Sequence, residues 1–271
     1  MNYKDNNMKV IRRIFGNLDT KDNKDFIEKI FNTSFEWGYF IKDVDEKSQE
    51  YKQVREVITK NGWHDSVIGT EFSKQEVYNA EILYFVGARA FSYPEPQSPS
   101  FLESTYFDSC KECGIYGEQK ADFAIKKQPI LGSGGLGTLH WVYDELFSTY
   151  EVYKNYFEGL NMDFRPVKLM NKKVSAENIV QLIIPLHNTS LEMARFESSS
   201  CEVCGRIKYS PSIHGFFPLP KGNSFHITKT NEFFGSGHSA SHRILVSNEM
   251  MQQMIQHKMA KYHQFVPCKA E

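Results

Sequence analysis

The sequence lacks the long apolar run that a membrane span requires. None of its 271 residues falls in a stretch approaching the roughly 18 consecutive apolar side chains of a transmembrane helix. Residues Met1 to Arg13 are polar and charged and contain no apolar signal core. We therefore expect a cytoplasmic protein without a membrane partner.

The chain also lacks a strong charge of either sign. It has 32 Lys and Arg against 33 Asp and Glu, a formal net charge of −1. A near-neutral chain has no general attraction to polyanions, and its adjacent lysines occur only as pairs, Lys126-Lys127 and Lys172-Lys173. Nucleic acid is therefore a disfavoured partner.

Catalytic motifs are absent as well. None of the nine histidines lies in an H-E-x-x-H motif or in the H-x-E…C-x-x-C pattern of zinc deaminases. The run Gly132-Ser133-Gly134-Gly135 is not followed by the Gly-Lys-Ser/Thr of a P-loop. A strand is expected after it, whereas a dinucleotide fingerprint needs a helix, so we predict a tight turn. The sequence predicts no enzyme and no catalytic residues.

Only five cysteines are present, and four of them form two matching C-x-x-C-G motifs. These are Cys110-Lys111-Glu112-Cys113-Gly114 and Cys201-Glu202-Val203-Cys204-Gly205. A turn brings the two thiolates of each motif to one ion, and the glycine permits the positive φ that closes the turn. Together the motifs supply a tetrahedral site, so we predict zinc bound by Cys110, Cys113, Cys201 and Cys204.

The two cysteine pairs are much farther apart in sequence than the roughly 15–20 residues that separate the pairs of common zinc ribbons. A shared metal would therefore connect two distant parts of the fold. Cysteines spaced in this way suit metal binding in a reducing compartment, and a redox dithiol is the alternative interpretation. Because a closed four-cysteine site has no open coordination position, the zinc is expected to be structural.

Residues 1–71 are predicted to form a helical N-terminal region. One apolar stripe follows Asp25, which we expect to cap a helix. A second stripe ends at Asn61-Gly62, a typical helix C-terminus. The two stripes consist of Phe26, Ile27, Ile30 and Phe31, and of Tyr51, Val54, Val57 and Ile58.

An internal repeat occupies the rest of the chain. Residues 123–142 and 225–246 share one order of features: a Phe-x-Ile-x-Lys segment, a Gly-Ser-Gly turn and an apolar strand. A helix-like segment and a Phe-x-Pro strand follow each, and apolar runs at 82–86 and 179–184 precede the cysteine motifs. We predict an α+β protein with similar α/β modules at 72–171 and 172–271, produced by an internal duplication and joined by the zinc.

The repeat also assigns roles to residues outside the metal site. Cys268 aligns with Val167, which predicts a buried core residue rather than a fifth ligand. His140 and His242 follow the two Gly-Ser-Gly turns, which predicts a shared structural role. The second module carries an insertion near 211–222, expected to pack on its own module or, alternatively, to contribute to recognition.

The cysteine motifs and the C-terminal segment resemble the double-CXXCG motif family, a bacterial group placed among the immunity proteins of toxin systems. The matching residues are Cys110, Cys113, Gly114, Cys201, Cys204, Gly205, Phe233 to Gly237, Ile244 to Ser247, Phe265 and Pro267. The resemblance covers about residues 105–271, whereas residues 1–70 show no match and Cys268 departs from the usual apolar ending. It implies a cytosolic protein that binds and neutralises a cognate toxin protein.

An alternative function is that of a zinc-dependent nucleic-acid-binding or regulatory protein, because zinc ribbons often bind nucleic acid. The near-neutral charge and the absence of basic clusters interleaved with aromatic residues argue against it. An enzyme would require a pocket assembled from residues distant in sequence. The sequence therefore favours a non-enzymatic binding protein.

Overall fold

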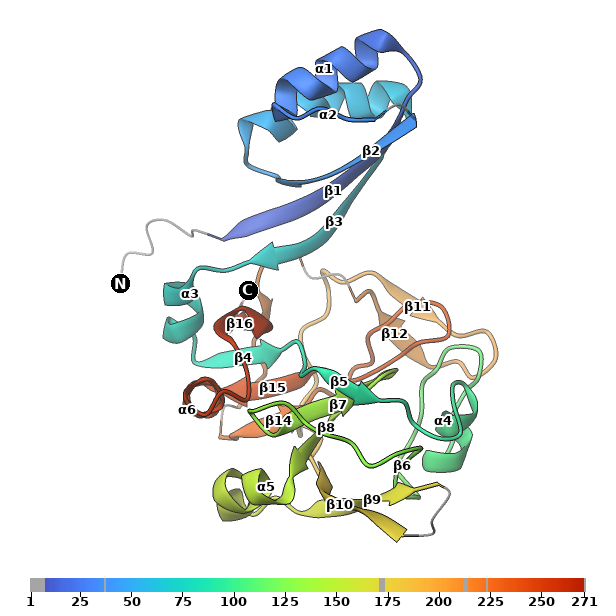
Figure 1. Ribbon diagram of the computed structural model, residues 1–271, viewed down its shortest axis with the longest axis vertical. Coiled ribbons are helices and arrows are strands. Elements are labelled where there is room, and N and C mark those ends of the chain that lie inside the picture. Colours follow the sequence, from blue (N-terminus) through green and yellow to red (C-terminus); the bar gives the residue numbers. More distant parts are fainter. Residues whose placement is uncertain (1–7, 37, 171–173, 212–213, 223, 271) are drawn as a thin grey trace. The chain divides into compact units, whose positions relative to one another are not determined.

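The computed structural model describes residues 8–36, 38–170, 174–211, 214–222 and 224–270, and it divides into two compact units (Figure 1). The first contains the described residues up to Glu76 together with residues 214–216. The second contains the described residues from Val77 to Pro211 and from Phe217 onward, so it holds both predicted modules except residues 72–76 of the first and 214–216 of the second. Among the described residues, no helix is long and apolar enough to cross a bilayer.

The first unit is a three-stranded antiparallel sheet with helices on one face (Figure 1). The sheet has the order β2 (Gly38–Asp45), β1 (Lys9–Leu18), β3 (His64–Glu71). Helix α1 (Lys21–Phe31) connects β1 to β2, and α2 (Gln49–Asn61) connects β2 to β3. Their apolar stripes pack on the sheet in a core of Ile14, Leu18, Ile27, Phe40, Val44, Tyr51, Val54 and Ile58.

The prediction of a helical N-terminal region is wrong because it missed these three strands. Both predicted stripes do lie on helices, and Gly62, at φ +63°, ends α2 as expected. Helix α1 begins earlier than predicted, since the Thr20 hydroxyl rather than Asp25 caps it and accepts the Asn23 N–H at 3.2 Å. The alternation of β1 was obscured by adjacent arginines at a register shift between Ile11 and Arg12.

The second unit contains a six-stranded, a five-stranded and a two-stranded sheet. The six-stranded sheet has the order β5 (Ala90–Ser92), β7 (Leu136–Leu139), β8 (Val142–Thr149), β10 (Val174–Leu182), β9 (Phe164–Leu169), β6 (Ala124–Ile125). The five-stranded sheet has the order β13 (Phe217–Pro218), β16 (Phe265–Lys269), β4 (Ile82–Phe85), β15 (Ile244–Ser247), β14 (Ile227–Lys229). Strands β11 (Ser198–Ser200) and β12 (Ile207–Tyr209) form the hairpin.

Short helices connect these strands (Figure 1). Helix α3 (Lys74–Asn79) precedes β4, and α4 (Ser100–Thr105) precedes the first cysteine motif. Helices α5 (Tyr150–Tyr156) and α6 (Asn248–Gln256) follow β8 and β15 directly, and the 3₁₀ helices η1 (Glu158–Leu160) and η2 (Tyr262–Gln264) lead into β9 and β16. The protein is therefore a mixed α+β structure, as predicted.

The two large sheets share a central arrangement. Strand β10 lies between β8 and β9, as β4 lies between β15 and β16. The register also agrees: Ile179 is opposite Thr149 and Ile82 opposite Ser247, while Val180 is opposite Pro166 and Leu83 opposite Pro267. The strand that precedes each cysteine motif thus pairs with the strands that follow the other motif.

The structure contradicts part of the sequence alignment between the halves. Strand β6 runs parallel to β9, and β13 runs parallel to β16, so β6 corresponds to β13 rather than to β14. The turn at 132–134 precedes β7, whereas the turn at 235–237 follows β14. The sequence alignment was therefore wrong to treat the two Phe-x-Ile-x-Lys segments, and the two Gly-Ser-Gly turns, as equivalent positions of the two halves. Such short motifs depend on the local turn and do not indicate where a strand lies in a sheet.

The insertion near 211–222 is divided between the units. The Gly215 N–H donates to Thr70 Oγ1 at 2.8 Å, and the Phe216 ring centroid lies 5.1 Å from that of Phe72. Phe217 is fully buried in the second unit. The expectation that the insertion packs on its own module is therefore wrong for residues 214–216; Ile213 and the Lys172-Lys173 pair lie outside the described residues.

Candidate metal centre

The four predicted ligands converge on one point of the second unit. The Sγ atoms of Cys110, Cys113, Cys201 and Cys204 all lie within 4.8 Å of one another, and all four cysteines are free. The Sγ–Sγ distance is 3.9 Å between Cys110 and Cys201 and 3.6 Å between Cys113 and Cys204. A tetrahedral site with Zn–S bonds of about 2.3 Å places its sulfurs about 3.8 Å apart. The cluster can therefore hold one metal ion.

The two C-x-x-C-G motifs have the same local structure. In each, the glycine N–H donates to the carbonyl of the first cysteine at 2.8 Å. The N–H of that cysteine donates to the residue after the glycine, at 2.8 Å for Ile115 and 3.0 Å for Arg206. Gly114 and Gly205 have φ of +77° and +69°, which agrees with the predicted need for positive φ.

Each motif forms the tip of a hairpin-like loop. The second motif connects β11 to β12. The first is flanked by a bridge between Tyr106 and Gln119, and the Phe107 N–H donates to the Glu118 carbonyl at 2.9 Å. Two loops from distant parts of the chain thus present their thiols to each other.

The loop between β14 and β15 packs against the cluster. The cluster contacts Ile115 and Ala240, with Phe233 packed at its side. Lys208 Nζ donates to the Cys113 carbonyl at 3.0 Å and also to the Gly237 carbonyl. The Phe233–Gly237 segment named in the family resemblance therefore supports the first motif.

Two cations lie near the cluster, Arg206 against a thiol and Lys208 against the backbone of the first motif. Arg206 Nε donates to Cys204 Sγ at 3.5 Å, and this bond lowers the pKa of Cys204 to about 6. Burial raises the pKa of Cys113 to about 12. Four thiolates around a divalent ion would carry a net charge of −2, and Arg206 and Lys208 would offset it. Arg206 thus favours the thiolate of Cys204, whereas burial favours the protonated thiol of Cys113, so Cys113 would need a bound metal ion to ionise at neutral pH.

The two motif glycines provide a matched pair of variants. Both have positive φ, so either Gly→Ala change costs about 1–2 kcal/mol of backbone strain. A Cβ on Gly114 would also lie 2.3 Å from the His238 carbonyl oxygen, whereas nothing lies within 4 Å of a Cβ on Gly205. We expect Gly114→Ala to lower the melting temperature clearly more than Gly205→Ala. Equal shifts in thermal denaturation would contradict the packing of the β14–β15 loop on the first motif.

The other predicted residues lie outside the cluster. Cys268 is buried opposite Phe217, which confirms its core role, and burial raises its pKa. His140 stacks on Tyr93 with ring centroids 4.2 Å apart, whereas His242 packs on Phe233 at 4.0 Å. Each histidine thus packs on an aromatic ring, but the partner residues come from different segments, so the shared structural role stays a prediction.

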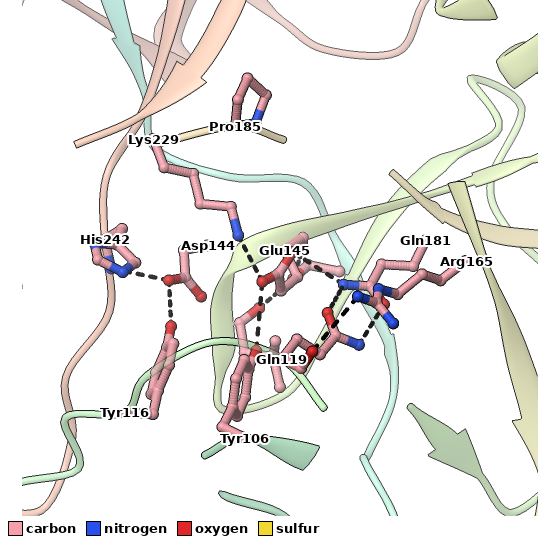
Figure 2. Close-up of polar contacts among 12 residues, drawn as sticks. Tyr106, Tyr116, Gln119, Asp144, Glu145, Arg165, Gln181, Pro185, Lys229 and His242 are labelled. Atoms are coloured by element: carbon pink, nitrogen blue, oxygen red, sulfur yellow. Dashed lines mark hydrogen bonds and ion pairs between the residues drawn. The ribbon is translucent and has the colours of Figure 1, made fainter. Parts of the chain in front are cut away.

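A buried polar network is the second feature of the unit, and sequence analysis missed it (Figure 2). Lys229 of β14 and Glu145 of β8 are 9% and 3% exposed, and Lys229 Nζ lies 2.6 Å from Glu145 Oε1. Gln181 Nε2 donates to Glu145 Oε2 at 3.1 Å, and the Tyr106 hydroxyl donates to Oε1 at 3.4 Å. The Glu145 carboxylate thus joins side chains from both large sheets.

Asp144 completes the network from the same strand. Its Oδ2 accepts the Tyr116 hydroxyl and, at 3.0 Å, the His242 backbone N–H (Figure 2). Because Tyr116 follows the first cysteine motif and His242 precedes β15, Asp144 ties the motif to the five-stranded sheet. The two adjacent acids between apolar residues of β8 were the available signal. Both acids are almost fully buried, at 1% and 3% exposed, and their oxygens are held by partners from both large sheets.

The network shifts the pKa values of its members. Burial raises the pKa of Glu145, and Lys229 opposes that shift. Burial alone would lower the pKa of Lys229, but the Glu145 and Asp144 carboxylates raise it. Burial, followed by the carboxylates, raises the pKa values of Tyr106 and Tyr116.

These shifts predict loss of stability at alkaline pH. Groups whose pKa is raised on folding contribute stability that is complete below the unfolded-state pKa and is lost as pH rises through the folded-state value. For Lys229 and the two tyrosines the ordinary values are 10.5 and 10.0, so the loss begins above about pH 10. Thermal denaturation across this range, with tyrosinate absorbance recorded in parallel, measures it. A melting temperature unchanged well above pH 10 would contradict the burial of the network.

Fold and site define a mixed α+β protein whose second unit holds a four-cysteine cluster able to bind a metal ion. Comparisons with protein-family models, curated proteins and solved structures found no match.

Proposed function

We propose that this protein is an immunity protein that binds and neutralises a cognate bacterial toxin, without enzymatic activity of its own. The convergence of the two C-x-x-C-G motifs into one cluster carries the proposal. These motifs and the Phe233–Gly237 segment that packs beside them are the features of the double-CXXCG resemblance. Their mutual contacts support treating the resemblance as one structural unit rather than as scattered matches.

Zinc is the metal we propose for the cluster. Four thiolates at tetrahedral spacing match a structural zinc site, and thiolate ligands select zinc over hard cations such as magnesium. With all four positions filled by protein, the ion would have no place for substrate. Its contribution would be folding free energy, since it would join loops from both halves of the second unit.

We also propose that the second unit arose by internal duplication. The first strand of each half, β4 or β10, pairs with the later strands of the other half. Support comes from the equivalent registers of β10 and β4 and from the identical hydrogen bonds of the two cysteine motifs. Helices α5 and α6 begin in the same way, with Thr149 and Ser247 as N-caps. The zinc would lie where the two halves meet and would hold them in register.

Co-expression with the toxin encoded beside this protein tests the function. We expect a stable complex on co-purification and rescue of growth, and we expect a Cys201→Ser/Cys204→Ser variant to lose both. Cys268→Ala is the matched control, because Cys268 is buried but lies outside the cluster. A wild-type protein that neither binds the toxin nor restores growth would reject the proposal.

A further inference from the structure

A cavity of about 650 Å³ lies in the second unit, away from the cysteine cluster. Its wall is formed by residues at the start of β5, by the Gly-Ser-Gly turn before β7 and by the connection between α6 and β16. Three basic residues line it: Arg89, Lys258 and Lys261. No Asp or Glu is among its lining residues, so the cavity has a local excess of positive charge in a near-neutral chain.

The three cations are exposed and uncompensated. Within the part of the chain that the structure describes, none of them forms an ion pair with a carboxylate. Other lysines of the second unit do find partners, such as Lys168 with Asp122 at 3.1 Å. Three unpaired cations around one hollow favour an anionic occupant.

The glycine-rich turn adds hydrogen-bond donors to this wall. The Gly135 N–H closes the turn on the Gly132 carbonyl at 2.8 Å, which confirms the predicted tight turn. The intervening N–H groups of Ser133 and Gly134 donate to no other described residue. Backbone N–H groups presented by a turn, with cations beside them, are the elements of a phosphate-binding concavity.

Close packing holds the turn against the cationic segment. A Cβ on Gly134 would lie 2.1 Å from the Lys258 carbonyl oxygen, so glycine is needed for this approach. Lys258 itself has φ +59°, a conformation that favours glycine or asparagine, so its backbone is held in an unusual geometry beside the turn. The backbone of the turn and the backbone of Lys258 are therefore fixed relative to each other.

We propose that this cavity binds a phosphate-class anion, either free or carried by a nucleotide. The turn N–H groups and the three cations contact the phosphate oxygens, and apolar residues of the wall, including Phe91, Leu131 and Met259, contact any organic part. The site differs from a P-loop, since it lacks Gly-Lys-Ser/Thr and the strand β7 follows the turn. The inference does not depend on toxin binding.

Calorimetric titration of the full-length protein with pyrophosphate and with ATP at low salt tests the site. We expect saturable binding that weakens as salt screens the exposed cations. Arg89→Gln/Lys261→Gln is expected to weaken it about tenfold for each cation removed. Lys126→Gln/Lys127→Gln changes the charge equally at exposed lysines outside the cavity and is expected to bind as the wild type does. Tighter binding of ATP than of pyrophosphate would identify a nucleotide as the source of the phosphate.

Three results would overturn the proposal. The first is the absence of saturable binding of either probe at low salt. The second is equal weakening in the cavity and control variants while both keep the wild-type melting temperature, which would indicate general charge attraction. The third is binding of an acidic peptide with no binding of pyrophosphate or ATP, which would reassign the cavity to protein carboxylates.

Discussion

Replacing Cys113 by serine is expected to abolish metal binding and to destabilise the second unit by several kcal/mol. Cys113 is the most buried of the four cysteines, at 4% exposed, and its Sγ lies 3.6 Å from that of Cys204. Zinc binding to structural sites of this type is worth roughly 10–16 kcal/mol in small peptides, and part of that free energy stabilises the fold. Elemental analysis should find one zinc per wild-type chain and none in the variant, and urea denaturation should report the loss of stability.

Cys268→Ala is the control for this experiment. It removes a buried sulfur from β16 but leaves the cluster intact, so one zinc per chain should be retained. A chelator should lower the stability of the wild type and of Cys268→Ala while leaving Cys113→Ser unchanged. A Cys113→Ser variant that keeps the metal content and the stability of the wild type would refute the shared site. If the purified wild-type protein contains iron instead of zinc, the bound metal is iron, which also forms tetrahedral thiolate sites.

Replacing Lys229 by methionine is expected to destabilise the protein by about 3–5 kcal/mol, because it leaves the buried Glu145 carboxylate without its counter-charge. Lys229 Nζ lies 2.6 Å from Glu145 Oε1, and both side chains are buried. Burial already raises the pKa of Glu145, and the loss of Lys229 raises it further. The variant should therefore lose more stability than the wild type as pH rises above the unfolded-state value of 4.5, where the unfolded chain releases the proton first. Urea denaturation across this pH range measures the effect.

The matched variant is Glu145→Gln/Lys229→Met. It removes both charges together, and the single amide oxygen of glutamine can still accept one of the two hydrogen bonds that Glu145 accepts from Gln181 and Tyr106. We expect the double variant to recover most of the stability that Lys229→Met loses, which gives a large coupling energy in a double-mutant cycle. Zinc content should be unchanged in both variants. A double variant as unstable as the single one would show that the lysine stem, rather than its charge, matters here.

The sequence by itself determined the local features of this protein. The positive φ of Gly114 and Gly205 follows from the C-x-x-C-G turn, which needs only residues that are neighbours in sequence. The same holds for the apolar stripes of α1 and α2 and for the C-terminus at Gly62, because helical periodicity and capping are set within a few turns of chain. The four clustered cysteines were predictable because metal sites of this kind use a small set of ligand types and spacings.

Only the tertiary structure decided which strands pair. The apolar run of β4 is compatible with either sheet, and its place between β15 and β16 depends on partners far away in sequence. The strands of the first unit were missed for a related reason, since Arg12 pairs with Asp65 of another strand and its charge masks the alternation.

Tertiary structure likewise assembled the charged sites. Glu145 and Lys229 lie in strands of different sheets, and Arg89 and Lys261 line one cavity although they are far apart in the chain. A charge in a sequence carries no indication of its partner, because Coulomb interaction depends on distance in space and on burial, both of which are set by folding. The motifs are therefore local and predictable, whereas the network and the cavity exist only in the folded chain.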